Sequence, residues 1–394
     1  MSVSQRLKGA MESSSWIRRM FEEGAELKAR LGPENVCDFT LGNPDLEPPP
    51  GFKEALLQAA QDRRPGLHTY MPNAGLLAPR QALADHLSRV HALEFKAHDL
   101  ILTCGAAGAL NVILKALLDP GDEVVVFAPY FPEYLFYADN HGGVGLVVET
   151  DDLFQVDLSR LESVMSPRTR ALIINSPNNP TGQVYDAATL KELGRFLSHH
   201  AGRHGRPVYL VADEPYRRLV YDGLEVPSIF AAYPNTLLAT SFSKDLSIPG
   251  ERLGYVAVSP RAAGRGELAA AMVLANRILG FVNAPALMQR VVANLTEISV
   301  DIKPYARRRD LFSDLLTQAG YRFFKPKGAF YIFPEAPGGD DLAFVARLKE
   351  ENILAVPGRG FGRAGYFRLA FCVPEETIAR AAPGLARARE GMGK

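Results

Sequence analysis

The sequence predicts an α/β fold in which a mostly parallel sheet is covered by helices. Short runs rich in Val, Ile and Leu recur through the middle of the chain, and most of them lack the polar alternation of a half-exposed strand. Segments of helical length, such as 108–118 and 187–199, separate many of these runs. The seven expected strands are 99–104, 123–128, 144–149, 170–175, 207–213, 237–242 and 254–259.

The last of these strands follows its predecessor through a loop of about a dozen residues, so a tight crossover and an antiparallel return both remain open. After residue 264 the pattern changes to a long helical stretch, interrupted near 283–285, and then to a mixture of short strands and helices. A smaller α+β unit is therefore expected there. Its elements are the helices 302–319 and 341–350 and the strands 321–324, 328–333, 353–356 and 366–371.

A chain of 394 residues is too long for one compact core, so two domains are expected. We predict a large domain over residues 46–295 and a small domain over residues 296–394. Residues 1–45, which include a helix over 15–30, are expected to pack with the small domain, and Pro48–Pro50 reads as a linker.

Composition excludes several classes of protein. Lys+Arg and Asp+Glu both number 44, and no basic block indicates a nucleic-acid surface. The run Arg307-Arg308-Arg309 is interpreted as one exposed helical turn. Three widely spaced cysteines argue against a disulfide framework and for a reducing compartment. The histidines lack metal-ligand spacing, and no signal peptide or membrane-spanning run is apparent, so a cytoplasmic protein without a metal is expected.

The most informative motif is Ser241-Phe-Ser243-Lys244, which stands at the end of an expected strand with Arg252 eight residues on. A lysine in this place can form a Schiff base, and the serines and the arginine can hold a dianionic phosphate beside it. Carrying a phosphorylated aldehyde such as pyridoxal phosphate requires this combination.

Other strand ends offer matching groups, and ligands bind at the carboxyl ends of the strands in an open parallel sheet. The small residues Gly105-Ala-Ala-Gly108 open a helix where a phosphate can approach. Phe131 offers an aromatic face, and the two prolines of Ser-Pro-Asn-Asn179-Pro fix an asparagine between them. Asp213 ends an apolar strand, where a carboxylate needs a cation or a donor such as a protonated pyridine nitrogen.

Together these motifs resemble the fold-type I, pyridoxal-phosphate-dependent aminotransferases of class I/II, the aspartate aminotransferase superfamily. Asn-Asn-Pro-Thr-Gly, Asp-Glu-Pro-Tyr and Ser-Phe-Ser-Lys with the downstream arginine are jointly specific. The matching motifs run from Leu41-Gly42 to Phe367-Arg368, which is nearly the whole chain. The resemblance implies an enzyme that moves an amino group between an L-amino acid and a 2-oxo acid.

The resemblance also implies roles for individual residues around the cofactor. Lys244 would form the Schiff base and then shuttle the substrate proton, while Asp213 would keep the pyridine nitrogen protonated. Asn179 and Tyr216 would bind the 3′-oxygen of the ring, and Phe131 would stack on it. The phosphate would be held by Gly105, Ala106, Ala107, Ser241, Ser243 and Arg252, although the family commonly has a hydroxyl residue where this chain has the two alanines.

For the substrate, Arg368 matches the arginine that clamps the α-carboxylate, with Gly42 and Asn179 adding hydrogen bonds. Tyr70 resembles the tyrosine that reaches the phosphate of a neighbouring subunit, which implies a homodimer. A departure of no chemical consequence is Pro79, which replaces the usual leucine before Arg80.

The motifs leave alternatives open for both the reaction and the substrate. A β-lyase, a decarboxylase or a cyclopropane-forming synthase would use the same cofactor groups. A transcription regulator is excluded, because only some forty residues precede Gly42. Both an aspartate/glutamate-type specificity and a broad specificity remain open. For residues 13–23, an amphipathic helix is favoured over direct contact with the substrate. The candidates for reading the substrate side chain are Ser14, Ser15, Trp16, Arg18, Arg277 and Asn283.

Overall fold

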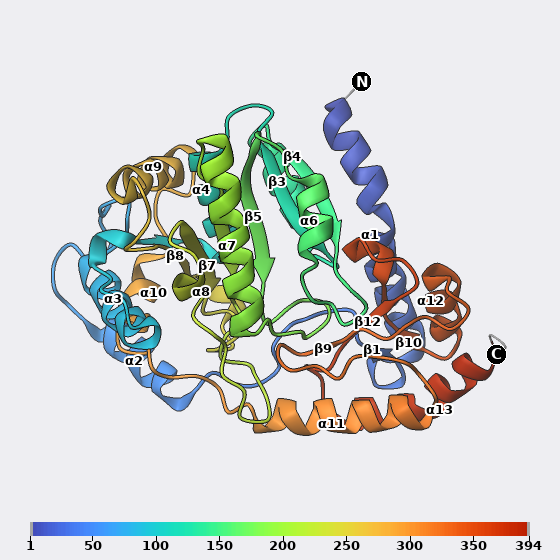
Figure 1. The fold of residues 1–394 in the computed structure, drawn as a ribbon. Coiled ribbons are helices and arrows are strands. Elements are labelled where there is room, and N and C mark those ends of the chain that lie inside the picture. The colour runs from blue at the N-terminus through green and yellow to red at the C-terminus, as the bar shows by residue number, and fades with distance from the viewer. Residues whose placement is uncertain (1–2, 392–394) are drawn as a thin grey trace.

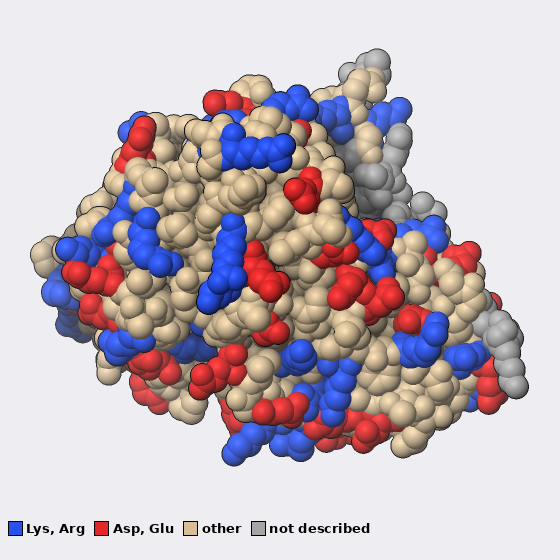
Figure 2. Space-filling model, viewed as in Figure 1, with Lys and Arg blue, Asp and Glu red and all other residues tan. Residues whose placement is uncertain are grey.

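The computed structural model describes residues 3–391, except for the side chains of residue 10 and residues 12–21. Within this part of the chain, no helix combines the length and the apolar character needed to cross a bilayer. Basic and acidic side chains are interspersed over the face seen in Figure 2, as the equal numbers of the two charges lead one to expect.

A seven-stranded sheet forms the centre of the molecule, as the sequence predicts (Figure 1). The strand order is β2-β8-β7-β6-β5-β3-β4, and β8 alone runs antiparallel to its neighbours, which decides the connection left open above. The strands are β2 (Leu100–Thr103), β3 (Glu123–Ala128), β4 (Val144–Glu149), β5 (Thr169–Asn175), β6 (Tyr209–Asp213), β7 (Thr236–Ser241) and β8 (Gly254–Val258).

Both faces of this sheet are buried along six of its strands, which explains why those strands lack polar alternation, whereas the edge strand β4 is mostly exposed. Along β6, Leu210 and Ala212 enter the apolar core on one face, while Tyr209 and Val211 enter the core on the other. One core also contains side chains of α2 (Pro50–Gln61), α3 (Leu77–His91), α7 (Ala187–His204), α8 (Ile229–Ala232) and α10 (Ala286–Val292). The other includes α4 (Gly105–Leu117), α5 (Glu133–Asn140) and α9 (Arg265–Ile278), while α6 (Leu158–Val164) packs near β4.

A second unit lies beside the sheet and has its own core of aromatic and aliphatic side chains (Figure 1). It contains the antiparallel sheet β11-β12-β9, made of β9 (Tyr331–Ile332), β11 (Val356–Pro357) and β12 (Phe367–Ala370). Its helices are α11 (Lys303–Gln318), α12 (Asp341–Glu350) and α13 (Glu375–Glu390).

The N-terminal segment contacts this second unit. Strand β1 (Cys37–Asp38) pairs in parallel with β10 (Ile353–Leu354). Helix α1 (Gln5–Leu31) places Leu27 against Leu354, and Lys349 forms an ion pair of 2.6 Å with Glu23. Tyr216 of the large unit also belongs to the second core, so the two units meet around that residue.

Several local predictions are wrong. Helix α1 begins at Gln5 and not near residue 15, and the strand expected over 353–356 is divided between β10 and β11, which belong to different sheets. No strand forms over residues 321–324, where the chain passes from α11 into an irregular segment. Helix α7 continues five residues beyond the expected end, to His204, and stops at Gly205, whose φ of 65° is left-handed. The arginine run on α11 is not an exposed turn, because Arg309 is only 2% exposed and is bound by both carboxylate oxygens of Asp222.

Candidate active site

A cavity of about 380 Å³ opens where β5, β6 and β7 end, as the topology of a parallel sheet predicts. Most of the residues singled out in the sequence line it. They are Gly42, Ala106, Ala107, Phe131, Asn179, Asp213, Tyr216, Ser241, Ser243, Lys244, Arg252 and Arg368. Chain segments more than 300 residues apart in sequence thus meet around one space, with Thr40 accepting a hydrogen bond from Arg368.

Asp213 carries a buried carboxylate at the end of β6, with 6% of the residue exposed. Burial raises the pKa of this carboxyl to about 7, a hydrogen bond from Tyr134 opposes the rise, and the nearby Glu214 adds to it. The Tyr134 hydroxyl donates to Oδ2 at 2.5 Å, whereas Oδ1 has no hydrogen-bond partner among the described residues. A buried oxygen of this kind is suited to a charged N–H donor.

Tyr134, whose hydrogen bond orients Asp213, was not anticipated from the sequence. Its signal was its position three residues after Phe131, in the short segment that leads from β3 into α5. The rings of Phe131 and Tyr134 are in edge contact, with centroids 5.5 Å apart. One short segment thus supplies both an aromatic face to the cavity and the hydrogen bond to Asp213.

Lys244 follows β7 and points into the cavity. Its Nζ donates to the carbonyl oxygen of Gly42 at 2.8 Å. Burial lowers the pKa of this amine to about 8, with smaller contributions of both signs from neighbouring groups. Near neutral pH, the neutral and nucleophilic form of this amine is therefore more abundant than in an exposed lysine.

Two tyrosines, Tyr216 and Tyr331, line the same cavity as Lys244. Their hydroxyls are 3.0 Å apart, and burial raises the pKa of Tyr331 to about 12. Gly42 must be a glycine here, because a Cβ at this position would lie 1.8 Å from the Tyr331 hydroxyl. Tyr331 was not anticipated from the sequence, because it belongs to none of the motifs that carry the resemblance.

The side of the cavity near α4 carries the groups expected to bind phosphate. Gly105 begins α4 with a φ of 70°, and a Cβ there would lie 3.0 Å from Nη2 of Arg252. Gly105 itself does not line the cavity, but its lack of a side chain lets the guanidinium approach the first turn of the helix. The next two residues, Ala106 and Ala107, do line it.

Arg368 and Asn179 line the same cavity. Arg368 is 8% exposed; its Nη1 donates to Asn179 Oδ1 at 3.1 Å and its Nη2 to the Thr40 carbonyl at 2.5 Å. Asn175 accepts from the Asn179 backbone N–H at 2.7 Å and thereby fixes the turn that carries this amide. The Nε of Arg368 is buried without a partner among the described residues, so the guanidinium retains donor capacity.

Glu133 is a further lining residue that the sequence analysis did not name. It begins α5, and its Oε2 is buried without a partner among the described residues. Burial raises the pKa of its carboxyl, while a hydrogen bond donated by its own backbone N–H and the charge of Arg368 lower it.

The remaining predicted residues lie elsewhere. Tyr70 is 93% exposed and does not line the cavity. Arg277 is exposed near the end of α9, and Asn283 donates to the Pro72 carbonyl at 2.9 Å. The side chains of Ser14, Ser15, Trp16 and Arg18 fall outside the described residues.

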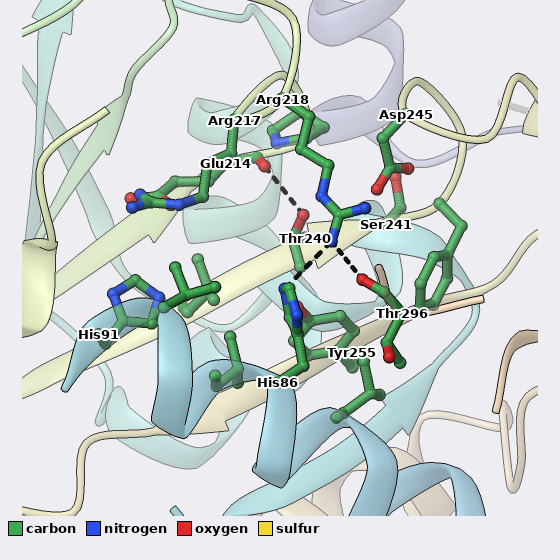
Figure 3. A pocket seen from close by; sticks show the side chains of 16 residues that line it. His86, His91, Glu214, Arg217, Arg218, Thr240, Ser241, Asp245, Tyr255 and Thr296 are labelled. Atoms are coloured by element: carbon green, nitrogen blue, oxygen red, sulfur yellow. Dashed lines mark hydrogen bonds and ion pairs between the residues drawn. The ribbon is translucent and has the colours of Figure 1, made fainter. Parts of the chain in front are cut away.

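A smaller pocket of about 50 Å³ lies next to the cavity and shares Pro215 and Ser241 with it. Figure 3 shows Arg218 directed towards His86 and Thr296 in this pocket. Arg218 donates to the Thr296 carbonyl and, at 2.7 Å, to that of Ile298. The pocket is therefore lined by groups that bind the segment leading to α11.

The donor set of the large cavity fits pyridoxal phosphate. Oδ1 of Asp213 offers an acceptor for a pyridine N–H, and Lys244 offers an amine for the aldehyde. Arg252 beside the first turn of α4 offers a positive site for the phosphate. Phe131 lines the same space with an aromatic ring.

Comparisons with known proteins identify the family. The family model for aminotransferase class I and II matches residues 34–385. Aspartate/prephenate aminotransferase of Thermus thermophilus is 34% identical over 92% of this chain and 93% of its own length. Aromatic-amino-acid aminotransferase 2 of Thermococcus litoralis is 30% identical over 97% and 96%. The crystal structure of an amino transferase from Eubacterium rectale superposes with a TM-score of 0.96 at 40% identity, covering both chains in full. The chain therefore belongs to the class I and II aminotransferases and is a pyridoxal-phosphate-dependent transaminase of fold type I.

Proposed function

We propose that Lys244 is the group that binds the cofactor aldehyde covalently and then moves the proton at the substrate Cα. The bound cofactor withdraws electrons from Cα, which makes that proton removable. The observation that carries this assignment is that Lys244 Nζ, with a pKa lowered to about 8, lies in one cavity with the buried carboxylate of Asp213. An amine with this pKa both accepts and returns a proton near neutral pH.

The other lining residues orient the reacting groups. Asp213, held by Tyr134, accepts the N–H of the pyridine ring and keeps that proton in place. Tyr216 and Asn179 bind the 3′-oxygen, and Phe131 stacks on the ring. Arg252, with the start of α4 and the two serines, holds the phosphate.

We propose that Arg368 clamps the α-carboxylate of the amino acid, with Gly42 and Asn179 assisting. A guanidinium binds a carboxylate through two parallel hydrogen bonds, and Arg368 has an unpartnered Nε. Every amino acid donor carries this carboxylate, so Arg368 supports a broad range of donors. The names of the relatives cover aspartate, prephenate and aromatic amino acids, which also favours a broad range here.

We further propose that the enzyme works as a homodimer in which Tyr70 reaches the phosphate site of the partner. Its support is that Tyr70 is 93% exposed and stands outside the cavity of its own subunit. Within the subunit, we propose that residues 1–45 and 296–394 act as one domain beside residues 46–295, supported by the pairing of β1 with β10. The three free cysteines favour a reducing compartment such as the cytoplasm.

The test is a half-reaction screen with the purified, cofactor-loaded enzyme and single L-amino acids. We expect conversion to the pyridoxamine spectrum with release of the matching 2-oxo acid. Lys244→Ala should lower turnover by about 10⁴-fold or more and remove the visible absorbance of the bound cofactor.

A folded Lys244→Ala enzyme that still transaminates would refute the role of this lysine. Release of pyruvate with ammonia, or of carbon dioxide, would instead indicate a lyase or a decarboxylase. Circular dichroism of the variant provides the control for folding.

A further inference from the structure

Glu133 places a carboxyl group in the cavity for which the roles above leave no task. It stands two residues after Phe131, at the start of α5, and lines the same space as Arg368. Its Oε2 is buried without a hydrogen-bond partner among the described residues. A buried, unpartnered carboxylate oxygen is unfavourable, so a ligand group that donates to it gains binding free energy.

The charges around the cavity restrict which ligand group that is. Among the described residues that line it, the cations are Lys244, Arg252 and Arg368. In the proposed function, Lys244 and Arg252 serve the cofactor and Arg368 serves the α-carboxylate. A second carboxylate on the substrate would therefore meet Glu133 without a cation of its own from this lining.

The electrostatic consequence follows from the low polarity of the site. When Glu133 is ionised, which burial opposes and the charge of Arg368 favours, a second carboxylate a few ångströms away is repelled more strongly in this buried site than in water. An amide, a hydroxyl or an ammonium group can instead donate a hydrogen bond to the Glu133 carboxylate. The cavity thus distinguishes between side chains of equal size by the group at their end.

We infer that Glu133 is a specificity-determining residue. It accepts a hydrogen bond from amino acid substrates whose side chain ends in an N–H or O–H group, and it disfavours substrates whose side chain ends in a second carboxylate. This inference rests on the proposed function, because it takes Arg368 as the clamp for the α-carboxylate. It narrows the range of donors for this chain, and it sets the chain apart from relatives named for aspartate.

Isosteric amino acid pairs test this inference directly. Asparagine and aspartate differ only in the end group, as do glutamine and glutamate. We expect the wild type to convert the amides with at least about tenfold higher kcat/KM in the half-reaction, and Glu133→Gln to move this ratio at least about tenfold towards the acids. Alanine, which lacks an end group, should change by less than about threefold.

A binding measurement supplies a readout that does not depend on turnover. Succinate and its monoamide, succinamate, both present one carboxylate to Arg368, and only succinate adds a second. Calorimetric titration of the holoenzyme should give tighter binding of succinamate to the wild type, and Glu133→Gln should reduce the difference by about tenfold. The control is Asp139→Asn on the same helix, which removes one negative charge outside the cavity lining and should leave the ratio unchanged.

Two results would overturn the inference. A wild type that prefers aspartate to asparagine by tenfold or more would contradict it even if Glu133→Gln does not fold. So would a folded Glu133→Gln enzyme in which acids and amides change equally. In contrast, failure of the wild-type holoenzyme to convert any amino acid, alanine included, would refute the proposed function instead.

Discussion

Two adjacent pockets share Pro215 and Ser241, but they differ in how their charged groups are paired. In the smaller pocket, the one lining side-chain atom buried without a partner among the described residues is Nε2 of His91. In the smaller pocket the charged groups bind one another or the backbone (Figure 3). Arg218 donates to two carbonyls and contacts His86 at 3.1 Å, and Arg217 pairs with Glu214 at 2.9 Å. In the larger cavity, single atoms of Asp213, Glu133 and Arg368 are buried without partners among the described residues.

This difference separates a structural network from a binding site. Buried polar groups in native proteins are generally hydrogen-bonded, so a cluster of exceptions indicates where a ligand supplies the partner. The paired groups of the smaller pocket instead bind segments of the chain together. Asp245, the neighbour of Lys244, takes part, because its carbonyl accepts from Val300 at 2.7 Å and from Ser299 at 3.1 Å.

The largest effect is expected from removing the carboxylate of Asp213, which tests whether the unpartnered groups of the larger cavity bind a ligand. Asp213→Ala should still bind the cofactor through the lysine and the phosphate contacts. It should lower kcat by roughly 10²- to 10⁴-fold, because the proton on the pyridine nitrogen loses its buried acceptor. Stopped-flow absorbance of the half-reaction measures this rate. Near-normal activity would show that Asp213 does not hold that proton.

A pH series of the cofactor-free protein sharpens the same contrast. The pKa of Asp213 is raised from 3.8 to about 7, so the folded state binds this proton more tightly than the unfolded state. The contribution of the Asp213 carboxyl to the free energy of unfolding is fully present below about pH 4 and is lost as the pH rises through 7. Asp213→Asn should therefore stabilise the cofactor-free protein at pH 8 by on the order of 2–4 kcal/mol and have little effect near pH 4.

Thermal unfolding at the two pH values provides the measurement. An equal effect of Asp213→Asn at pH 4 and pH 8 would contradict the raised pKa. In the cofactor-bound enzyme, Asp213→Asn should no longer stabilise the protein at pH 8, because the ionised Asp213 carboxylate of the wild type then has a charged N–H partner.

The strands and most of the cavity lining could be predicted because both are local in sequence. Apolar runs specify the strands, and short motifs such as Ser-Phe-Ser-Lys244 stand directly at their ends. What could not be predicted depends on distant contacts. Arg309 is buried because Asp222, 87 residues away, neutralises it, and Tyr331 reaches Tyr216 only through the packing of the second unit. The strand expected over 321–324 failed for the same reason, since a strand needs a partner that an isolated segment does not reveal.

The smallest expected effect concerns the smaller pocket. Arg218→Met would leave the carbonyls of Thr296 and Ile298 without their donor, and because both residues are half-buried, losing the two hydrogen bonds together costs about 1–3 kcal/mol. We expect the free energy of unfolding to fall by about that amount in denaturant titrations, with kcat/KM within about threefold of the wild type. Arg64→Met is the matched control, because this exposed arginine has Asp62 as its ion-pair partner among the described residues, and it should leave the unfolding midpoint unchanged. A large loss of activity at unchanged stability would mean instead that this network acts on Lys244 through Asp245, and the division between the two pockets would not hold.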